Sequence, residues 1–126
     1  ASWPSISLVA GDHSVLVIIS EDPRVSHRAN EAMRIALGIV AGENEVAIVL
    51  TNGAVHLLDD DTDDLVDGDD IARYRASLRK LDIPFHVDDR AIPKGPEWNV
   101  EGHGIIPATP DAIARLMSSA ERFIVF

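Results

Sequence analysis

The stretch SVLVIISEDPRVSHRANEAMRIALGIVAG, residues 14–42, decides the fold of this chain. Residues 15–19 are an unbroken run of Val, Leu and Ile, which is typical of a strand buried on both faces of a parallel sheet. Ser20 or Asp22 is expected to cap the next helix, with Pro23 in its first turn, because the N–H that proline lacks has no partner there. The apolar positions of that helix lie on one face: Ala29, Ala32, Met33, Ala36, Leu37 and Val40.

Strand-like and helix-like segments continue to alternate after this unit. Residues 1–13 are an irregular lead-in, and residues 54–58 fit either a helix or an extended segment. Further strands are predicted at 46–50, 83–87, 104–107 and 123–126. This alternation predicts a single α/β domain over residues 1–126, built as a three-layer α/β/α sandwich with a mostly parallel sheet of about five strands.

Two further helices follow the same spacing rule. One covers residues 71–81, with a buried stripe and a solvated basic face: Ile71, Tyr74, Leu78 and Leu81 form the stripe, and Arg73, Arg75, Arg79 and Lys80 the basic face. The last helix opens at Thr109 with a proline in its first turn. Its predicted buried stripe is Ala112, Ile113, Leu116, Met117 and Ala120.

Composition excludes several function classes. The chain has 126 residues, a formal net charge of −10 and no cysteine. The negative charge disfavours nucleic acid and anionic membranes as partners. Disulfides, thiolate zinc sites and thiol nucleophiles are excluded within these residues. No apolar stretch reaches the roughly 20 residues of a membrane span, and we expect a cytoplasmic protein.

Residues 59–70 are the most biased stretch, with eight aspartates and no basic residue. A calcium-binding EF-hand does not fit, because placing Gly68 at the sixth position of the loop puts Leu65 at a ligand position and leaves the final glutamate absent. The run is therefore interpreted as an exposed acidic loop that leads into a helix capped by Asp69 or Asp70. Whether it binds cations stays open.

Polar side chains gather where the predicted strands end, at the edge where parallel sheets bind ligands. His86 and Asp88 are expected to face the same side of their strand. Trp98 and His103, in the loop rich in Gly and Pro over residues 91–110, are expected to close over this edge. The predicted ligand pocket contains Ser20, Asp22, Asn52, His86, Asp88, Asp89, Trp98 and His103.

No catalytic residue, metal site or cofactor is assigned to this pocket. Ser20 has no evident general base nearby in the sequence, and the acidic first loop lacks the glycines that bind phosphate. His86, Asp88 and His103 are chemically able to hold a metal ion, but no short His–x–His spacing supports that site. His56, flanked by apolar residues, is interpreted as a hydrogen-bonded histidine of the core or the rim.

The order of the motifs resembles the DsrE/DsrF-like family, small α/β proteins of bacterial and archaeal sulfur relay and sulfur oxidation. The similar segments are IISEDP at 18–23, ANEAMRIAL at 29–37, VAIVLTNGAV at 46–55, PFHV at 84–87, GII at 104–106, AIARL at 112–116 and AERFIVF at 120–126. The resemblance implies the family fold and an oligomer: a homotrimer, a homohexamer or a heteromer with related subunits.

This chain departs from the family pattern at one chemical position. Sulfur-transferring members carry a persulfide-forming cysteine just after the third strand, where this chain has Val87, Asp88, Asp89 and Arg90. A carboxylate is a hard, weak nucleophile and cannot replace a thiolate in sulfur transfer. We therefore expect a non-catalytic binding or accessory protein of sulfur relay. The alternative is a small-ligand-binding protein or enzyme that uses Asp88, His86 and His103 at the acidic rim.

Overall fold

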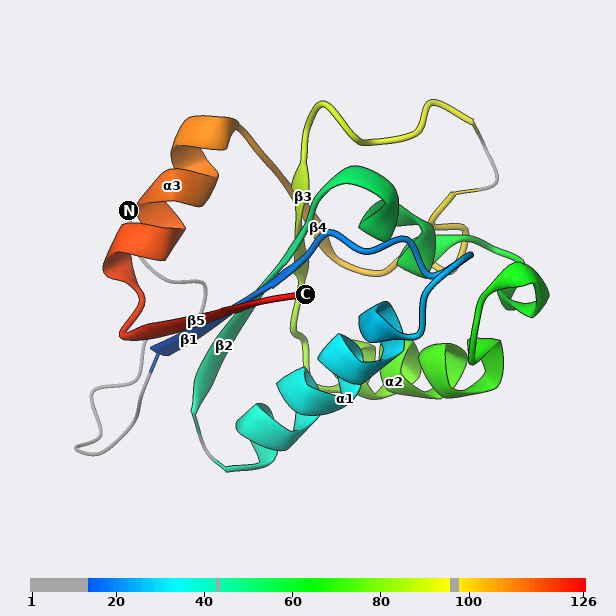
Figure 1. Cartoon of the computed structure of the whole chain (residues 1–126), viewed down its shortest axis with the longest axis horizontal. Coiled ribbons are helices and arrows are strands. Elements are labelled where there is room, and N and C mark those ends of the chain that lie inside the picture. The colour runs from blue at the N-terminus through cyan, green and yellow to red at the C-terminus, as the bar shows by residue number, and fades with distance from the viewer. Residues whose placement is uncertain (1–13, 43, 96–97) are drawn as a thin grey trace.

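The computed structural model describes residues 14–42, 44–95 and 98–126, so the predicted lead-in over residues 1–13 lies outside the described part. Within these ranges five strands form one sheet in the order β4-β3-β2-β1-β5, and all neighbours are parallel (Figure 1). The strands are β1 (Ser14–Ile19), β2 (Glu45–Leu50), β3 (Phe85–Asp88), β4 (Ile105–Ala108) and β5 (Arg122–Val125).

Helices cover both faces of this sheet. The helices α1 (Arg28–Ala41) and α2 (Gly68–Lys80) lie on one face and α3 (Pro110–Ser119) lies on the other (Figure 1). Between β2 and α2 the chain forms two 3-10 helices, η1 (Asn52–Leu58) and η2 (Thr62–Asp64). The predicted α/β sandwich is confirmed, and none of the helices in the described ranges is long and apolar enough to cross a membrane.

The core is built on the neighbouring strands β1 and β2. Leu16 and Val17 are fully buried although they point to opposite faces of β1, as the unbroken apolar run predicts. Burying such a side chain contributes about 1.5–3 kcal/mol to folding. The larger apolar cluster lies under α1 and α2, and the smaller one lies under α3. The smaller cluster contains Leu16, Ile18, Ala47, Val49 and Leu116.

The predicted start of the first helix is wrong, because α1 begins only at Arg28. Both predicted caps are occupied by other partners. The Ser20 hydroxyl donates to the carbonyl oxygen of Phe126 at 3.0 Å, and the Asp22 carboxylate accepts the backbone N–H of Arg24 at 2.9 Å. The loop between β1 and α1 is consequently longer than predicted.

The second helix also begins earlier than its predicted caps, Asp69 and Asp70. Its first residue is Gly68, and the residue before it, Asp67, has a left-handed φ of 58°. A Cβ at position 68 would lie 1.9 Å from the carbonyl oxygen of Thr62. Only glycine allows the two backbone segments to come this close. This contact fixes where α2 begins. Hydrophobic periodicity does not reveal it.

One member of the predicted solvated face of α2 is buried. Arg75 has an exposed fraction of 2%. Its position follows Ile71 by four residues and precedes Leu78 by three, so helix geometry puts its side chain on the inward face. By contrast Leu81, predicted in the buried stripe, is exposed just past the end of the helix.

The face of the sheet under α3 is thinly covered. Thr109 caps α3 as predicted, since its hydroxyl accepts the backbone N–H of Ala112 at 3.1 Å. Of the predicted buried stripe only Leu116 is buried, and the other four residues are partly exposed. The edge strand β5 is exposed along its whole length.

Candidate functional site

The carboxyl ends of the strands form a rim that carries the polar side chains. After β1, Asp22 accepts the backbone N–H of Arg24 and both guanidinium donors of the same residue, the shortest at 2.7 Å from Nη2. The Arg24 side chain holds the pKa of the Asp22 carboxyl below its ordinary value. A Cβ on Gly53, which follows β2, would lie 2.7 Å from the Cβ of Asp22, so glycine lets these two loops touch.

The end of β3 repeats this arrangement. Asp88 accepts the backbone N–H of Arg90 at 3.0 Å and the guanidinium Nη2 at 2.9 Å. The hydrogen bond from Arg90 lowers the pKa of the Asp88 carboxyl. In both Asp-x-Arg segments the aspartate therefore forms an ion pair with the arginine two residues later, which favours its ionised form.

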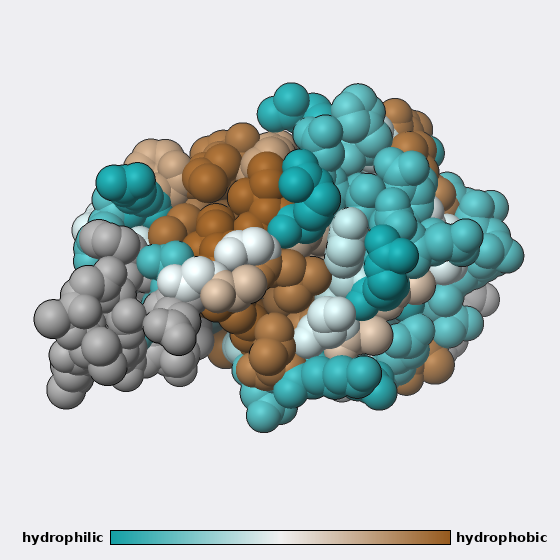
Figure 2. Space-filling model, turned by 90° about the horizontal axis from the view of Figure 1, so that it is seen from below, coloured by the Kyte–Doolittle hydropathy of each residue, from teal (hydrophilic) through white to brown (hydrophobic). Residues whose placement is uncertain are grey.

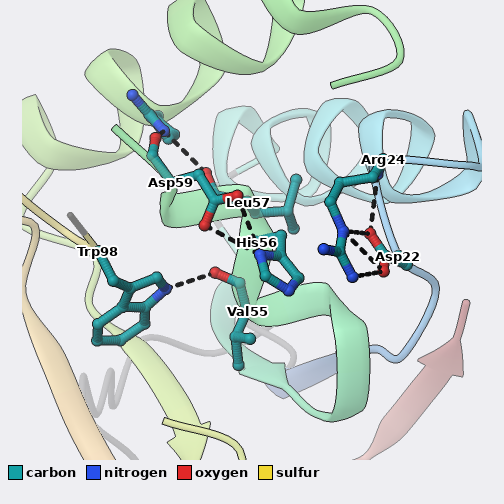
Figure 3. A network of polar contacts seen from close by, with 8 residues as sticks. Asp22, Arg24, Val55, His56, Leu57, Asp59 and Trp98 are labelled. Atoms are coloured by element: carbon teal, nitrogen blue, oxygen red, sulfur yellow. Dashed lines mark hydrogen bonds and ion pairs between the residues drawn. The ribbon is translucent and has the colours of Figure 1, made fainter. Parts of the chain in front are cut away.

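A histidine and an aspartate from the segment after β2 form the next part of the rim. His56 Nδ1 lies 3.0 Å from Asp59 Oδ2 and 3.1 Å from Oδ1 (Figure 3). An ionised carboxylate only accepts hydrogen bonds, so Nδ1 carries the proton of this contact. Asp59 thereby fixes the orientation of the imidazole and leaves Nε2 as its second polar atom.

Trp98 stands opposite this pair. Its indole Nε1–H donates to the carbonyl oxygen of Val55 at 2.7 Å (Figure 3), and the backbone N–H of Asn99 donates to Leu58 at 2.9 Å. These contacts bring the long loop onto η1 and leave a pocket of about 540 Å³. Its lining residues are His56, Asp59, Asp60, Asp61, Asp64, Pro93, Gly95 and Trp98.

Arg75 holds the base of this segment in place. Its buried guanidinium donates to the carbonyl oxygens of Leu57 at 3.0 Å and Asp59 at 2.7 Å, and to the Glu101 carboxylate at 2.8 Å. It thus joins α2, the end of η1 and the loop before β4. Carbonyl groups at the end of a 3-10 helix have no partner within the helix, and a buried cation satisfies them here.

Three of the predicted pocket residues lie on the rim in structural or exposed positions. Ser20 holds the last residue of the chain through its hydroxyl. Asn52 is exposed at the start of η1 with a positive φ of 51°. Asp89 is exposed, and its backbone N–H donates to Ala108 at 3.0 Å.

Of the two predicted histidines, His86 lies on the same face of β3 as Asp88, two residues before it, whereas His103 lies at the opposite end of that strand. His103 lies before β4, whose Ile105 pairs with Phe85 at the start of β3, whereas Asp88 is at the far end of that strand. Three residues of strand separate these ends by about 10 Å. His86 is buried on the α3 face, and burial lowers its pKa. Asp22 touches Gly53, the residue after Asn52, whereas Trp98 contacts Val55 further along η1 and His103 lies at the other end of the sheet.

Sequence reasoning missed the residues that shape the pocket. His56 and Asp59 are three residues apart, a spacing that brings side chains together only on a helical turn, and this segment was left open between helix and strand. Arg75 was assigned to solvent by its residue type. Among the described residues no three His, Cys, Asp or Glu side chains lie close enough together to hold a metal ion.

The fold and the rim together define the class of protein. It is a small α/β sandwich with an all-parallel sheet. Its rim carries two aspartates paired with arginines, the histidine His56 and the indole of Trp98, and the chain has no thiol. The family model of the DsrE/DsrF-like family matches residues 13–126. The chain therefore belongs to the DsrE/DsrF-like family, which confirms the resemblance noted in the sequence.

A solved structure is similar over almost the whole fold. The crystal structure of the ychN protein from E. coli superposes with a TM-score of 0.72 at 17% sequence identity, covering 90% of this chain and 99% of that chain. At this identity the likeness shows the fold alone. A search of curated proteins found no match.

Proposed function

We propose that this chain is a non-catalytic DsrE/DsrF-like protein that serves sulfur relay by binding other subunits. The observation that carries the proposal is the lack of any cysteine in these 126 residues. Sulfane sulfur is carried by an ionised thiol, and no other side chain has that soft nucleophilicity. Where sulfur-transferring members have their cysteine, at the end of β3, this chain has the ion pair between Asp88 and Arg90.

An exposed edge strand supports the binding role. In β5 the side chains of Phe123, Ile124 and Val125 are 51%, 37% and 52% exposed. In Figure 2 the hydrophobic residues gather in the part of the molecule where β5 lies, and the opposite part is largely hydrophilic. Exposed apolar edge strands are sites of protein association, since they offer both unpaired backbone groups and apolar area. We propose β5 as the assembly surface of a homotrimer, homohexamer or heteromer.

The assembly is tested by one charge placed on β5. Val125→Lys is expected to convert the oligomer to monomers, because a lysine in an apolar interface must lose its hydration without a partner. Val25→Lys is the matched control, since Val25 is 80% exposed in the loop before α1. Sedimentation velocity measures the mass of each variant. An oligomer that survives Val125→Lys contradicts the proposal, and a monomeric wild type excludes the homotrimer and the homohexamer.

The non-catalytic role is tested separately. The purified protein is incubated with a persulfide donor, and intact-mass spectrometry is expected to show no added sulfur. A sulfur adduct that passes to an acceptor protein contradicts the proposal. Binding of a small ligand at the rim is the second candidate function, and the pocket beside Trp98 favours it. The cytoplasm remains the predicted compartment.

A further inference from the structure

We propose that the pocket between His56 and Trp98 binds an organic cation through an alkylammonium or guanidinium group. The site lies on the rim at the end of β2, away from β5, so it does not depend on assembly. It also differs from the predicted site at Asp88, whose carboxylate is taken by Arg90.

The pocket has the size and the walls of a ligand site. Its volume of about 540 Å³ falls within the usual range for small-molecule pockets, about 300–1,000 Å³. One wall is the indole of Trp98, held by the 2.7 Å hydrogen bond to Val55. The face of an indole attracts cations. The other wall presents His56, whose Nδ1 lies 3.0 Å from the Asp59 carboxylate.

The charge of the pocket selects the sign of the ligand. Asp60, Asp61 and Asp64 line it together with Asp59, and within the described part of the chain none of these four carboxylates forms an ion pair with an arginine such as Asp22 and Asp88 form. Among the described residues these carboxylates do not converge to metal-ligand spacing. Negative charge spread over such a cavity fits a polyatomic cation with an apolar stem, whereas a metal ion requires oxygen ligands within about 2.6 Å.

The walls are held in position before any ligand arrives. Asp59 and Trp98 form an isolated antiparallel bridge of the backbone, and the buried Arg75 binds the carbonyl oxygen of Asp59 at 2.7 Å. Binding therefore requires little ordering of Asp59 and Trp98, which reduces its entropic cost.

The test uses agmatine and spermidine as probes on the full chain. The background variant Trp3→Phe leaves Trp98 as the sole tryptophan, since the chain has two. Both probes are expected to change Trp98 fluorescence saturably, and 1,5-pentanediol, a neutral analogue, is expected to have no effect. Asp61→Asn combined with Asp64→Asn is expected to weaken binding about three- to tenfold. Trp98→Leu, followed by calorimetry, is expected to weaken it by a similar factor.

A matched pair controls for net charge. Asp82→Asn combined with Asp111→Asn removes the same charge outside the pocket, and it is expected to leave the dissociation constant within about twofold. Equal weakening by both double variants, absence of saturation, or equal binding of the diol overturns the proposal. Saturable binding of Ca²⁺ that displaces spermidine at equal ionic strength also overturns it.

The source of the cation is resolved in the same assay. A lysine-rich peptide that binds at least about tenfold more tightly than spermidine identifies a protein side chain as the natural ligand. Equal or weaker binding of the peptide identifies a free amine. For either conclusion, the double variant Asp61→Asn with Asp64→Asn must bind the tighter of the two probes more weakly than the wild type does.

Discussion

At the scale of single residues, His103 is a buried titratable group without a well-formed hydrogen bond in the described part of the chain. It is 5% exposed, and neither ring nitrogen makes a hydrogen bond within the described residues. Glu101 Oε2 is 3.3 Å from Nε2 but poorly oriented. The ring lies edge-on to Phe85. Burial first, and then the positive charges of Arg75 and Arg79 on α2, lower the pKa of His103, against an opposing effect of Glu101.

A pH-dependent stability follows from this environment. In the unfolded chain His103 binds a proton as the pH falls below its ordinary pKa of 6.5, whereas in the folded protein it stays neutral to lower pH. The unfolded state thus binds more protons, so the free energy of unfolding falls as the pH drops through 6.5. Urea unfolding at pH 8 and pH 5 measures the loss, to which the buried His86 adds in the same direction.

The His103→Gln variant is expected to flatten this dependence, because glutamine does not titrate. The control is His27→Gln, which changes an exposed histidine in the loop before α1. If both variants keep the full pH dependence of the wild type, the buried histidine is not its source.

At the scale of elements, strands were easier to predict than the places where helices begin. The runs at Ser14–Ile19 and Glu45–Leu50 are buried on both faces, and no other local structure competes with such a pattern. The starts of α1 and α2 depend on contacts that lie outside the helix itself. Ser20 bonds to Phe126, and Gly68 touches Thr62, so neither start follows from local capping rules. The sequence predicted the rim residues that follow strands, such as Asp22 and Asp88. It did not predict the pairing of His56 with Asp59, because that contact depends on the 3-10 helix η1.

Arg75 is the clearest case of an element held by one side chain. Arg75→Met fills most of the same volume but leaves the carbonyl oxygens of Leu57 and Asp59 without their buried donor. The expected loss in the free energy of unfolding is about 3 kcal/mol. Chemical denaturation measures it against Arg73→Met on the same helix, whose ion pair with Asp70 is largely exposed and is worth at most about 1 kcal/mol. Equal losses for the two variants contradict the bracing role of Arg75.

At the scale of the whole molecule, the two proposed surfaces lie apart. The apolar strand β5 forms one edge of the sheet (Figure 1), and the pocket is lined by His56 of η1 and by aspartates of the acidic run. Eight of the 21 acidic residues fall within residues 59–70. Like charges this close repel one another, and the compact state carries that cost more than the unfolded chain does.

Salt should therefore stabilise this protein. The Debye length falls from about 30 Å at 0.01 M salt to about 8 Å at 0.15 M, which screens repulsion within the acidic run. At fixed protein concentration the Tm is expected to rise by about 4 °C over this range, equivalent to about 1 kcal/mol. Asp60→Asn with Asp61→Asn is expected to raise the Tm at low salt and reduce its dependence on salt, whereas Asp82→Asn with Asp111→Asn changes both less. A Tm that is flat with salt, or that responds equally to the two double variants, would show that the acidic run is not a source of strain.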